Sequence, residues 1–428
     1  MTSLLQRFFN VRREEVAPLL AAAFFFFCVL TALMMLRPVR DALGMQRGIE
    51  AIRWLFIGTA VITLAVNPVF GWLVSRFRRI VFIAVTYLFF ALSLVGFWAL
   101  IVLTPQAVGE TSGQVFYVWF SVFNLFSTMV FWALMADRFT LEQSKRLFGA
   151  IAVGGTLGAI AGPWLATLLA EPLGTPTLLL VAAGFLGCAI GAAWLVTHLQ
   201  PSPAHAGEPS AAAAADDRAV IGGSAWEGLA AVARSPYLLG ISGYVLVMTV
   251  MATFIYMTRL AMVDALGDTV DEQTRMFAQI DLFTQVTTLV LQGLVTGHLM
   301  KRFGVAVALM ILPVVVSLGF IGLAMVGSFA VLIVFEATFR ALQRAVTRPA
   351  RETLFTVVSR EDKYKSKAVT DTFVYRGGDV LGAWTEGGVR ALGFALAGLA
   401  SVAVPLAVIW MGLGVWLGRK QEALQQSR

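Results

Sequence analysis

The stretch RPARETLFTVVSREDKYKSKAVTDTFVYRGGDVLGAW, residues 348–384, places ionisable side chains inside a chain that is otherwise strongly apolar. Its basic first half runs directly into an apolar second half that carries Asp371, Arg376 and Asp379. An ionisable side chain at membrane depth costs about 2.5–3.5 kcal/mol on insertion scales, so such groups normally face water or a partner within a helix bundle. The stretch therefore indicates that something polar is handled inside a membrane.

The composition of the chain is typical of a membrane protein. Hydrophobic residues make up 58% of it and charged residues 13%, whereas a soluble domain holds about 25% charged residues. A membrane-spanning helix needs about 20 mostly apolar residues. We predict an all-α membrane protein with twelve such spans, at 16–36, 54–75, 80–104, 114–136, 148–170, 176–199, 236–258, 277–299, 304–326, 329–347, 369–391 and 395–417. Polar groups interrupt the eighth, tenth and eleventh spans.

Basic residues are distributed unequally between the two sides of the predicted membrane. If the amino terminus is cytoplasmic, 24 of the 32 Lys and Arg residues lie on the cytoplasmic side, seven lie outside, and Arg376 lies within a span. This bias is what the positive-inside rule expects. We therefore predict cytoplasmic termini, and the inner membrane of a Gram-negative bacterium as the location. The net charge of +7 follows from the topology, and nucleic-acid binding is not expected because no stacking surface accompanies the basic residues.

A segment rich in Ala, Pro and Ser, residues 200–225, separates the first six spans from the last six. This composition is typical of a flexible linker. The sequence thus predicts an N-terminal six-helix half at 1–199 and a C-terminal six-helix half at 226–428, joined by a cytoplasmic linker.

Two motifs recur across the linker at nearly the same offset. GWLVSRF at 71–77 returns as GHLMKRF at 297–303, which is 226 positions later. GGTLGA at 154–159 returns as GGDVLGA at 377–383, which is 223 positions later. The matching offsets indicate the duplication of a six-helix unit. Two six-helix halves resemble the architecture of major facilitator transporters, which bind substrate near the midplane between their halves.

The repeated motifs supply the candidate residues for helix packing and gating. Small residues four positions apart allow two helices to approach closely. The loop motifs resemble the signature loop between spans two and three of major facilitators, with Ser75 where that family has an Asp. The candidates are Gly71, Arg76, Gly154, Gly158, Gly297, Arg302, Gly377 and Gly378.

Ionisable residues at membrane depth, or beside a span, are the candidate substrate-binding residues. Guanidinium groups that line a cavity suit carboxylate or phosphate, which they hold through two parallel hydrogen bonds. We therefore expect a small anionic substrate. The candidates are Arg37, Arg40, Asp41, Asp281, Lys367, Asp371 and Arg376.

The spacing of some of these residues predicts local pairs. Glu336 and Arg340 are four positions apart, and Arg376 and Asp379 are three apart, so each pair can form an ion pair on a helix. Adjacent side chains do not face each other on a helix. Arg40 and Asp41 are therefore expected to find other partners.

Other chemistries lack a signature in the sequence. Cys28 and Cys188 lie within apolar spans, where we expect them to act as small hydrophobic residues. The three histidines have no metal-ligand spacing, so no metal site or cofactor is expected. A Gly-x-x-x-x-Gly-Lys loop is absent, which argues against ATP-driven pumping by this chain. No nucleophile–base pair indicates an enzyme.

Several short stretches carry a more specific resemblance. They are LRPVRDAL at 36–43, FWALMADRFTLEQSKRLFG at 131–149, RSPYL at 234–238, RPARE at 348–352 and KYKSKAVTD at 363–371. With them, the sequence resembles the nucleotide transporters of the plastid and intracellular-bacterial ATP/ADP translocase family, a branch related to major facilitators. The resemblance runs over most of both halves, and Asp281 falls where the eighth span of that family has an Asp.

The resemblance assigns roles to particular positions. Two lysines that matter for transport in that family fall on Arg40 and Lys367, and its intramembrane glutamates of spans four and seven fall on Phe120 and Ile255. Arg in place of Lys keeps the charge and changes its geometry. The absence of both glutamates leaves ATP/ADP exchange open, while the fold and the cationic sites still match.

The leading hypothesis is a secondary transporter of nucleotides, or of a related phosphorylated anion, that works by alternating access as a monomer in the bilayer. Asp41, Asp281 and Asp371 are expected to pair with Arg40 and Lys367 when no substrate is bound. The alternative is a transporter of a non-nucleotide organic anion, or a proton-coupled efflux pump in which Asp281 or Asp371 carries the proton. A third hypothesis is a membrane receptor or assembly protein that transports nothing.

Overall fold

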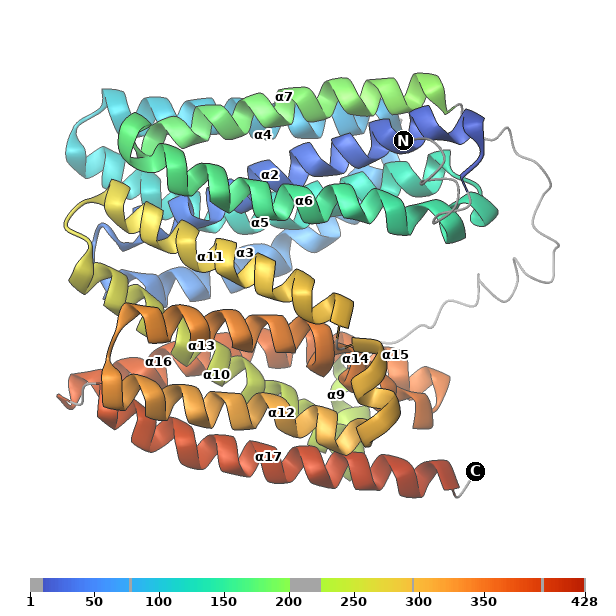
Figure 1. Cartoon of the computed structure of the whole chain (residues 1–428), viewed down its shortest axis with the longest axis vertical. Helices are drawn as coiled ribbons and strands as arrows, with labels where there is room; N and C mark the ends of the chain where they lie inside the picture. Colours follow the sequence, from blue (N-terminus) through green and yellow to red (C-terminus); the bar gives the residue numbers. More distant parts are fainter. Residues whose placement is uncertain (1–10, 77–78, 201–224, 295, 394–395, 427–428) are drawn as a thin grey trace. The chain divides into compact units, whose positions relative to one another are not determined.

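The computed structural model describes residues 11–76, 79–200, 225–294, 296–393 and 396–426, and all regular structure among them is helical (Figure 1). The prediction of an all-α membrane protein is therefore confirmed. The helices are α2 (Val16–Met45), α3 (Ile49–Arg76), α4 (Arg79–Leu103), α5 (Gln106–Arg138), α6 (Leu141–Leu173), α7 (Thr175–Leu199), α9 (Ala225–Arg234), α10 (Pro236–Leu266), α11 (Val270–Leu294), α12 (Thr296–Val326), α13 (Phe329–Leu342), α14 (Arg348–Leu354), α15 (Arg360–Val369), α16 (Tyr375–Ala391) and α17 (Leu396–Gln426).

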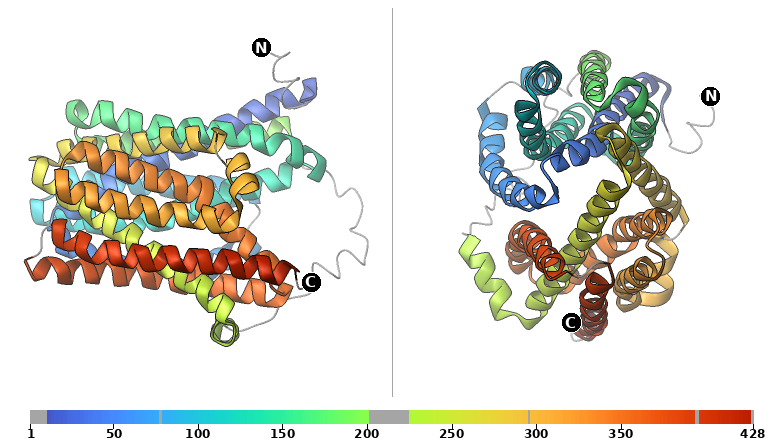
Figure 2. Two further views of the ribbon diagram at one scale, coloured as in Figure 1. Left: turned by 60° about the horizontal axis from the view of Figure 1, so that its bottom comes forward. Right: turned by 90° about the vertical axis from the view of Figure 1, so that its left-hand side faces the viewer.

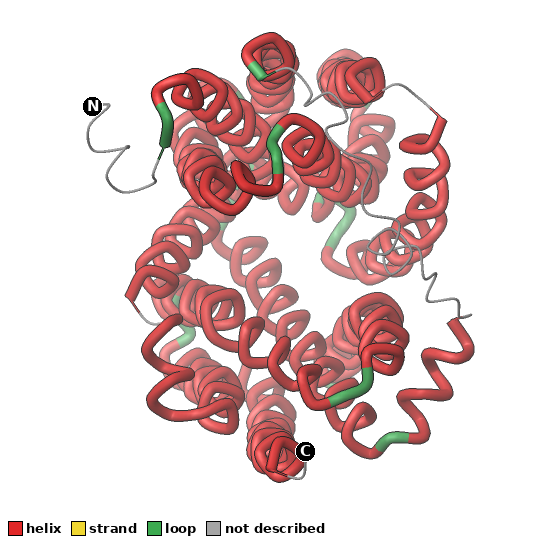
Figure 3. The backbone as a smooth tube through the Cα atoms, turned by 90° about the vertical axis from the view of Figure 1, so that its right-hand side faces the viewer, coloured by secondary structure: helices red, strands yellow, loops and turns green. Residues whose placement is uncertain are grey.

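Four short helical segments of other types complete the described chain. The segments η1 (Arg13–Glu15) and η3 (Phe355–Val357) are 3₁₀ turns. The segments η2 (Gln343–Thr347) and η4 (Thr370–Val374) are π-helical and join α13 to α14 and α15 to α16. Figure 3 shows that most loops between the described helices are short.

Nine helices in the described residues are long and apolar enough to cross a membrane. The predicted eighth, tenth and eleventh spans, which polar groups interrupt, are the three that fall outside this set. They coincide with α11, with α13 and η2, and with η4 and α16. Helix α11 is long enough but carries several charged and polar residues, whereas α13 and α16 are short, with 14 and 17 residues, because a π-helical segment adjoins each. The placement of their charged residues in a membrane depends on neighbouring helices that shield the polar groups.

The chain divides into two compact units. Unit 1 comprises Met1–Glu208 and Val263–Leu282, and unit 2 comprises Pro209–Met262 and Phe283–Arg428. This division differs from the predicted halves in one respect, because Val263–Leu282 groups with the N-terminal helices. Most of the predicted linker, 201–224, lies outside the described residues.

Polar contacts explain why the start of α11 belongs to unit 1. The backbone N–H of Thr175, at the start of α7, donates to Oδ1 of Asp271 at 2.6 Å. The Thr175 hydroxyl also donates to the hydroxyl of Thr274 at 2.9 Å. Arg275 forms an ion pair with Glu171 of α6 at 3.1 Å. These side chains hold the start of α11 against the α6–α7 connection.

A third repeat supports the duplication and lies near the ends of two helices. The sequence DALG at 41–44, at the end of α2, returns at 264–267, at the end of α10, with an offset of 223. The offset equals that of the glycine motif, so α2 corresponds to α10, and α6 corresponds to α16.

Helix α2 is the core of unit 1, and Figure 2 shows the neighbouring helices running alongside it. Its aromatic side chains pack against α5, with the Phe26 and Phe131 rings stacked at 4.1 Å. Tyr87 of α4 is fully buried and donates to the carbonyl oxygen of Ser127 at 2.7 Å. Because lipid tails are as apolar as leucine, close packing and hydrogen bonds of this kind hold membrane helices together.

Glycines bring α6 directly against the backbone of α2. A Cβ on Gly154 would lie 2.2 Å from the carbonyl oxygen of Ala23, and one on Gly158 would lie 2.3 Å from that of Phe27. Both distances are far below van der Waals contact, so only glycine fits at these positions. The expected packing role of these two glycines therefore has a direct structural basis.

The corresponding helices of unit 2 pack in the same way. A Cβ on Gly378 would lie 2.8 Å from Cβ of Thr249, and one on Gly382 would lie 2.8 Å from Cβ of Thr253. Gly377, which was expected to pack with Gly378, instead has no atom within 4 Å of a Cβ position. The reason is that Gly378 and Gly382 share the side of α16 that meets α10. The other gating candidates, Gly71, Arg76, Gly297 and Arg302, lie outside the residues whose surroundings the structure describes.

Replacing Gly158 by Ala is expected to lower the unfolding temperature of the detergent-solubilised protein, because the methyl group would push α6 away from α2. Gly184→Ala on α7 is the matched control, since no atom lies within 4 Å of its Cβ position. Alanine is favoured over glycine in a helix by about 1 kcal/mol, so the control should leave the unfolding temperature unchanged or raise it. Equal destabilisation by both variants would contradict the packing role of Gly158.

Candidate functional site

The last turns of α2 hold the first group of candidate residues. Asp41 is fully buried, and the Arg40 side chain is 16% exposed. Arg40 donates through Nε to Oδ1 of Asp41 at 2.8 Å and contacts the same oxygen through Nη2. The prediction that these adjacent residues need other partners is therefore wrong. Adjacent positions point in different directions on a helix, but the long Arg side chain folds back over its neighbour.

The guanidinium of Arg40 also lies over two aromatic rings of α5. Its Cζ is 4.8 Å from the ring centroid of Tyr117 and 5.1 Å from that of Phe120. A guanidinium at these distances is attracted by the negative face of the ring. An aromatic surface of α5 thus supports the Arg40 cation.

A second ion pair of unit 1 joins α2 to α11. Arg37 Nε lies 3.6 Å from Oδ2 of Asp281, whose side chain is 2% exposed. Asp281 was expected to neutralise Arg40 or Lys367, and the structure pairs it with Arg37. This contact lies within unit 1 because the first half of α11 belongs to that unit.

The basic segment of unit 2 forms a chain of alternating charges at the junction of α14 and α15. Lys367 Nζ donates to Oε2 of Glu352 at 2.6 Å. Arg351 Nη2 lies 3.6 Å from Oε1 of Glu352 and 3.3 Å from Oδ1 of Asp371. The expected pairing of Asp371 with Lys367 is thus wrong, because Arg351 and Glu352 intervene. The Lys367, Glu352 and Asp371 side chains are 34%, 38% and 39% exposed, so solvent reaches three members of this chain.

The charges around Glu352 change its acidity. Burial raises the pKa of the Glu352 carboxyl, but the hydrogen bond from Lys367 and the positive charges of Lys367 and Arg351 outweigh it and lower the pKa below its usual 4.5. A carboxyl whose pKa is lower in the folded protein stabilises the fold above the unfolded pKa, and this contribution disappears as the pH falls through the folded value. At neutral pH the Glu352–Lys367 contact is therefore an ion pair.

Both π-helical segments of the described chain flank this group of charges. The segment η4 contains Asp371 itself, and η2 lies immediately before α14, which carries Arg351 and Glu352. A π-helical turn widens the helix by one residue and is frequently found at functional sites. The two segments therefore mark the α13–α16 region as a candidate functional region.

The predicted local pairs within α13 and α16 are present. Arg340 Nη2 lies 2.5 Å from Oε1 of Glu336, and Arg376 Nη1 lies 3.4 Å from Oδ2 of Asp379. Glu336 has a second partner that the spacing did not indicate, because Arg259 Nη1 of α10 lies 3.2 Å from the same oxygen.

The sequence contained a signal for some of the partners that were missed. Arg351 and Glu352 lie inside the RPARE motif, and Arg259 lies near the end of the predicted seventh span. Tyr117 gave no signal, because an aromatic residue within an apolar span is most often part of the core.

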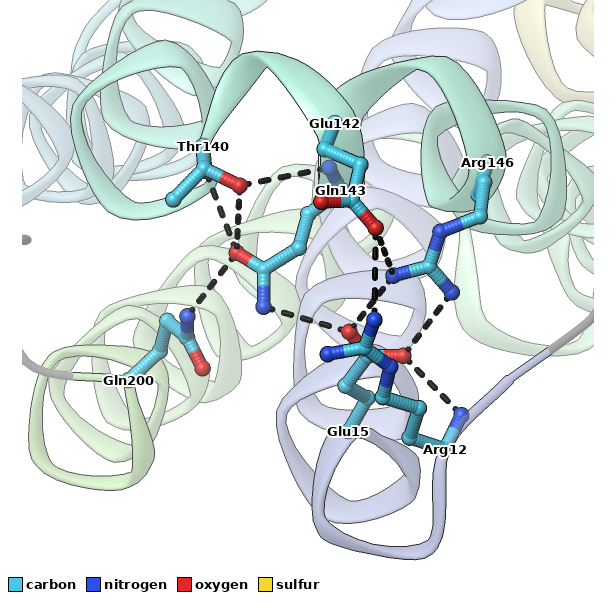
Figure 4. Close-up of polar contacts among 7 residues, drawn as sticks. All are labelled: Arg12, Glu15, Thr140, Glu142, Gln143, Arg146 and Gln200. Carbon is cyan, nitrogen blue, oxygen red and sulfur yellow. Dashed lines mark hydrogen bonds and ion pairs between the residues drawn. The ribbon is translucent and has the colours of Figure 1, made fainter.

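The loop that resembles the translocase family at 131–149 forms a structural network (Figure 4). Buried Glu15, just before α2, accepts hydrogen bonds from Arg146 at 2.8 and 3.1 Å and from Gln143 at 3.3 Å. Gln143 in turn accepts from the Gln200 side chain, beyond the end of α7, at 3.2 Å. The network connects the beginnings of α2 and α6 with the end of α7, so these side chains fasten three helices of unit 1 together.

The comparisons with known proteins agree with this architecture. The family model described as Major Facilitator Superfamily matches residues 19–343. The chain belongs to the major facilitator superfamily. It is therefore a multi-pass membrane transporter of that type. No curated protein matches the sequence.

Solved structures of other facilitators cover nearly the whole chain. A bacterial homologue of the human lysosomal transporter Spinster, inward-facing and unoccupied, is 15% identical, with a TM-score of 0.56 over 97% of this chain and 96% of its own. An auto-inhibited POT family peptide transporter is 14% identical, with a TM-score of 0.61 over 94% and 96%. The nucleoside transporter NupG is 16% identical, with a TM-score of 0.54 over 96% and 99%. At these identities the likeness establishes the fold alone.

Glu15→Gln is expected to lower the unfolding temperature of this facilitator, because Arg146 would lose the carboxylate that it holds through two hydrogen bonds. Glu142→Gln is the control, since Glu142 also contacts Arg146 and Arg12 but its side chain is 71% exposed. The measurement is thermal unfolding in detergent, monitored by the fluorescence of a dye that does not react with thiols. If the two variants unfold at the same temperature, the Glu15 network does not stabilise unit 1.

Proposed function

We propose that this facilitator transports nucleotides, or a related phosphorylated anion, by alternating access. The observation that supports this proposal most directly is the environment of the Arg40 guanidinium. This cation, just beyond the predicted first span and within the last turns of α2, contacts a buried carboxylate and two aromatic rings, and 16% of its side chain remains exposed. Exposed charge at membrane depth normally faces a water-filled path. A phosphate oxygen is the natural ligand for such a guanidinium.

Unit 2 supplies a second group that suits phosphate. Lys367 and Arg351 are both neutralised by carboxylates whose side chains are more than a third exposed. An exposed ion pair contributes little to stability, typically about 0–1 kcal/mol, so its partners can be exchanged at low cost. A polyphosphate carries several negative charges and can replace such carboxylates on both cations at once.

The proposed cycle depends on this exchange of partners. In the empty protein the resident carboxylates neutralise the cations, and in the loaded protein the phosphate groups take their place. A ligand shifts a conformational equilibrium only if it interacts differently with the two states. Because breaking and forming ion pairs alters the contacts of α2, α14 and α15, the substrate has a physical means of favouring one state.

The substrate class rests on the resemblance to the ATP/ADP translocase family, on the positions of Arg40 and Lys367. Phe120 and Ile255 replace that family's glutamates, and both are buried apolar residues. A non-nucleotide organic anion is the second candidate, because two glutamates of the family with nucleotide substrates are missing here. The nucleoside transporter among the solved structures shares only the fold at 16% identity and adds no evidence on the substrate.

We also propose the membrane setting and the assembly. The distribution of Lys and Arg supports an inner-membrane location with both termini in the cytoplasm. Unit 1 and unit 2 together contain the candidate cations on one chain, which supports a functional monomer. Membership of a transporter family argues against a receptor that transports nothing.

Purified protein reconstituted in liposomes loaded with ADP is expected to take up labelled ATP, and the double variant Arg40→Ala, Lys367→Ala is expected to lose this uptake. Loss of two phosphate contacts of about 1.5–3 kcal/mol each lowers transport by at least a hundredfold. Arg390→Ala is the control, because Arg390 pairs with Glu386 in the same unit and is not a candidate ligand. No uptake by folded wild-type protein would contradict the nucleotide proposal.

Competition separates the two substrate classes. Adenosine nucleotides are expected to inhibit ATP uptake at lower concentration than inorganic phosphate, because recognition then includes the base. Inhibition by small dicarboxylates at the same concentration as ADP would instead identify an organic-anion transporter.

A further inference from the structure

Within unit 2, two arginines contact a single buried carboxylate, and a third arginine follows one turn further along the chain. Arg259 of α10 and Arg340 of α13 both approach Oε1 of Glu336, at 3.2 and 2.5 Å. Arg344, one turn beyond Arg340, donates to Oε1 of Gln285 in α11 at 2.6 Å. Side chains of α10 and α13 thus meet at Glu336, and Arg344 of η2 meets Gln285 of α11.

The way in which the arginines contact Glu336 suits an exchange of anions. The Arg259 and Arg340 ion pairs converge on the same carboxylate oxygen, so the two guanidiniums share it. The strongest arginine–carboxylate contacts use two parallel hydrogen bonds, with one oxygen for each nitrogen. A phosphate has three terminal oxygens and can offer each guanidinium an oxygen of its own.

The members of this group differ in how far their side chains are exposed. Arg259 and Glu336 are fully buried, whereas the Arg340 side chain is 13% exposed. A charged side chain within a membrane span normally faces the bundle interior or a water-filled cavity. Arg340 is therefore the member of this group that an anion can reach, whereas Arg259 and Glu336 are enclosed.

The helix changes type at this edge. The π-helical segment η2 begins at Gln343, three residues after Arg340, and contains Arg344. An inserted π turn redirects the side chains that follow it, and such turns are frequent at functional sites. Without η2, the position of Arg344 relative to Arg340 would be that of an ordinary α-helix.

We propose that Arg340 and Arg344 form an anion-binding subsite within unit 2, in which Glu336 is the resident anion and a phosphate or carboxylate group of the cargo takes its place on Arg340. The subsite deepens the proposed function, because it rests on an anionic cargo and adds residues distinct from Arg40 and Lys367. Arg259 keeps Glu336 in place when the cargo displaces it from Arg340, so the carboxylate is never left without a cation.

Binding of pyrophosphate and inorganic phosphate to the purified full chain in detergent, measured by isothermal titration calorimetry at constant ionic strength, tests the subsite. Arg340→Gln and Arg344→Gln are expected to weaken pyrophosphate binding by about tenfold or more each, as the loss of a charge-assisted hydrogen bond requires. Glu336→Gln is expected to tighten binding severalfold, because the competing resident charge is gone. A purely structural ion pair predicts no tightening.

The controls separate this effect from damage to the fold. Glu386→Gln removes a carboxylate of the same spacing, paired with Arg390 at 2.8 Å in the same unit, and should leave the affinity unchanged. If Glu336→Gln does not fold, Glu336→Asp, which keeps the charge and withdraws it from Arg340, should also tighten binding. Unchanged pyrophosphate affinity in Arg340→Gln and Arg344→Gln, with the protein shown to be folded, would overturn the subsite.

The outcome is distinguishable from that of the transport experiment. Binding that depends on Arg340 without any ATP uptake would support the subsite and reject the nucleotide. ATP uptake that depends on Arg40 and Lys367, with pyrophosphate binding unaffected by Arg340→Gln, would support the transport proposal and reject the subsite.

Discussion

The placement of charge in this facilitator depends on the low polarity of the membrane interior. A buried ion without a partner costs several kcal/mol, so each must be matched by a counter-ion or by water. Several cations of the described helices meet carboxylates that are almost fully buried. Among these pairs are Arg37 with Asp281, Arg40 with Asp41, and Arg259 with Glu336. The same ion pairs therefore serve two purposes in the proposed cycle: they allow charged helices to fold in the membrane, and their carboxylates can be replaced by an anionic cargo.

Close helix packing gives these charges a rigid frame. In unit 1, Gly154 and Gly158 let α6 touch the backbone of α2, the helix that carries Arg37 and Arg40. In unit 2, Gly378 and Gly382 do the same for α16 and α10. Duplication has thus preserved the contact between equivalent helices, and Asp41 returns as Asp264, whereas Leu260 and Val263 stand at the positions of Arg37 and Arg40.

Much of the architecture could be predicted from the sequence. Hydropathy over about 20 residues identifies a spanning helix without knowledge of its neighbours, and the repeats at offsets of 223 and 226 reveal the two halves. The pairs Glu336–Arg340 and Arg376–Asp379 were also predictable, because helix geometry alone brings positions three or four apart together. The reassignment of Val263–Leu282 to unit 1 was not, because it depends on contacts with α6 and α7.

The sequence by itself determined the membrane class, the helices and the local ion pairs, since these follow from the chemistry of neighbouring residues. Only the tertiary structure decided that Arg40 lies on Tyr117 and Phe120, that Arg351 separates Asp371 from Lys367, and that two arginines share Glu336. The physical reason is the length of the charged side chains. A long side chain selects its partner from whatever the packing brings within a few ångströms, and residues distant along the chain supply most of those partners.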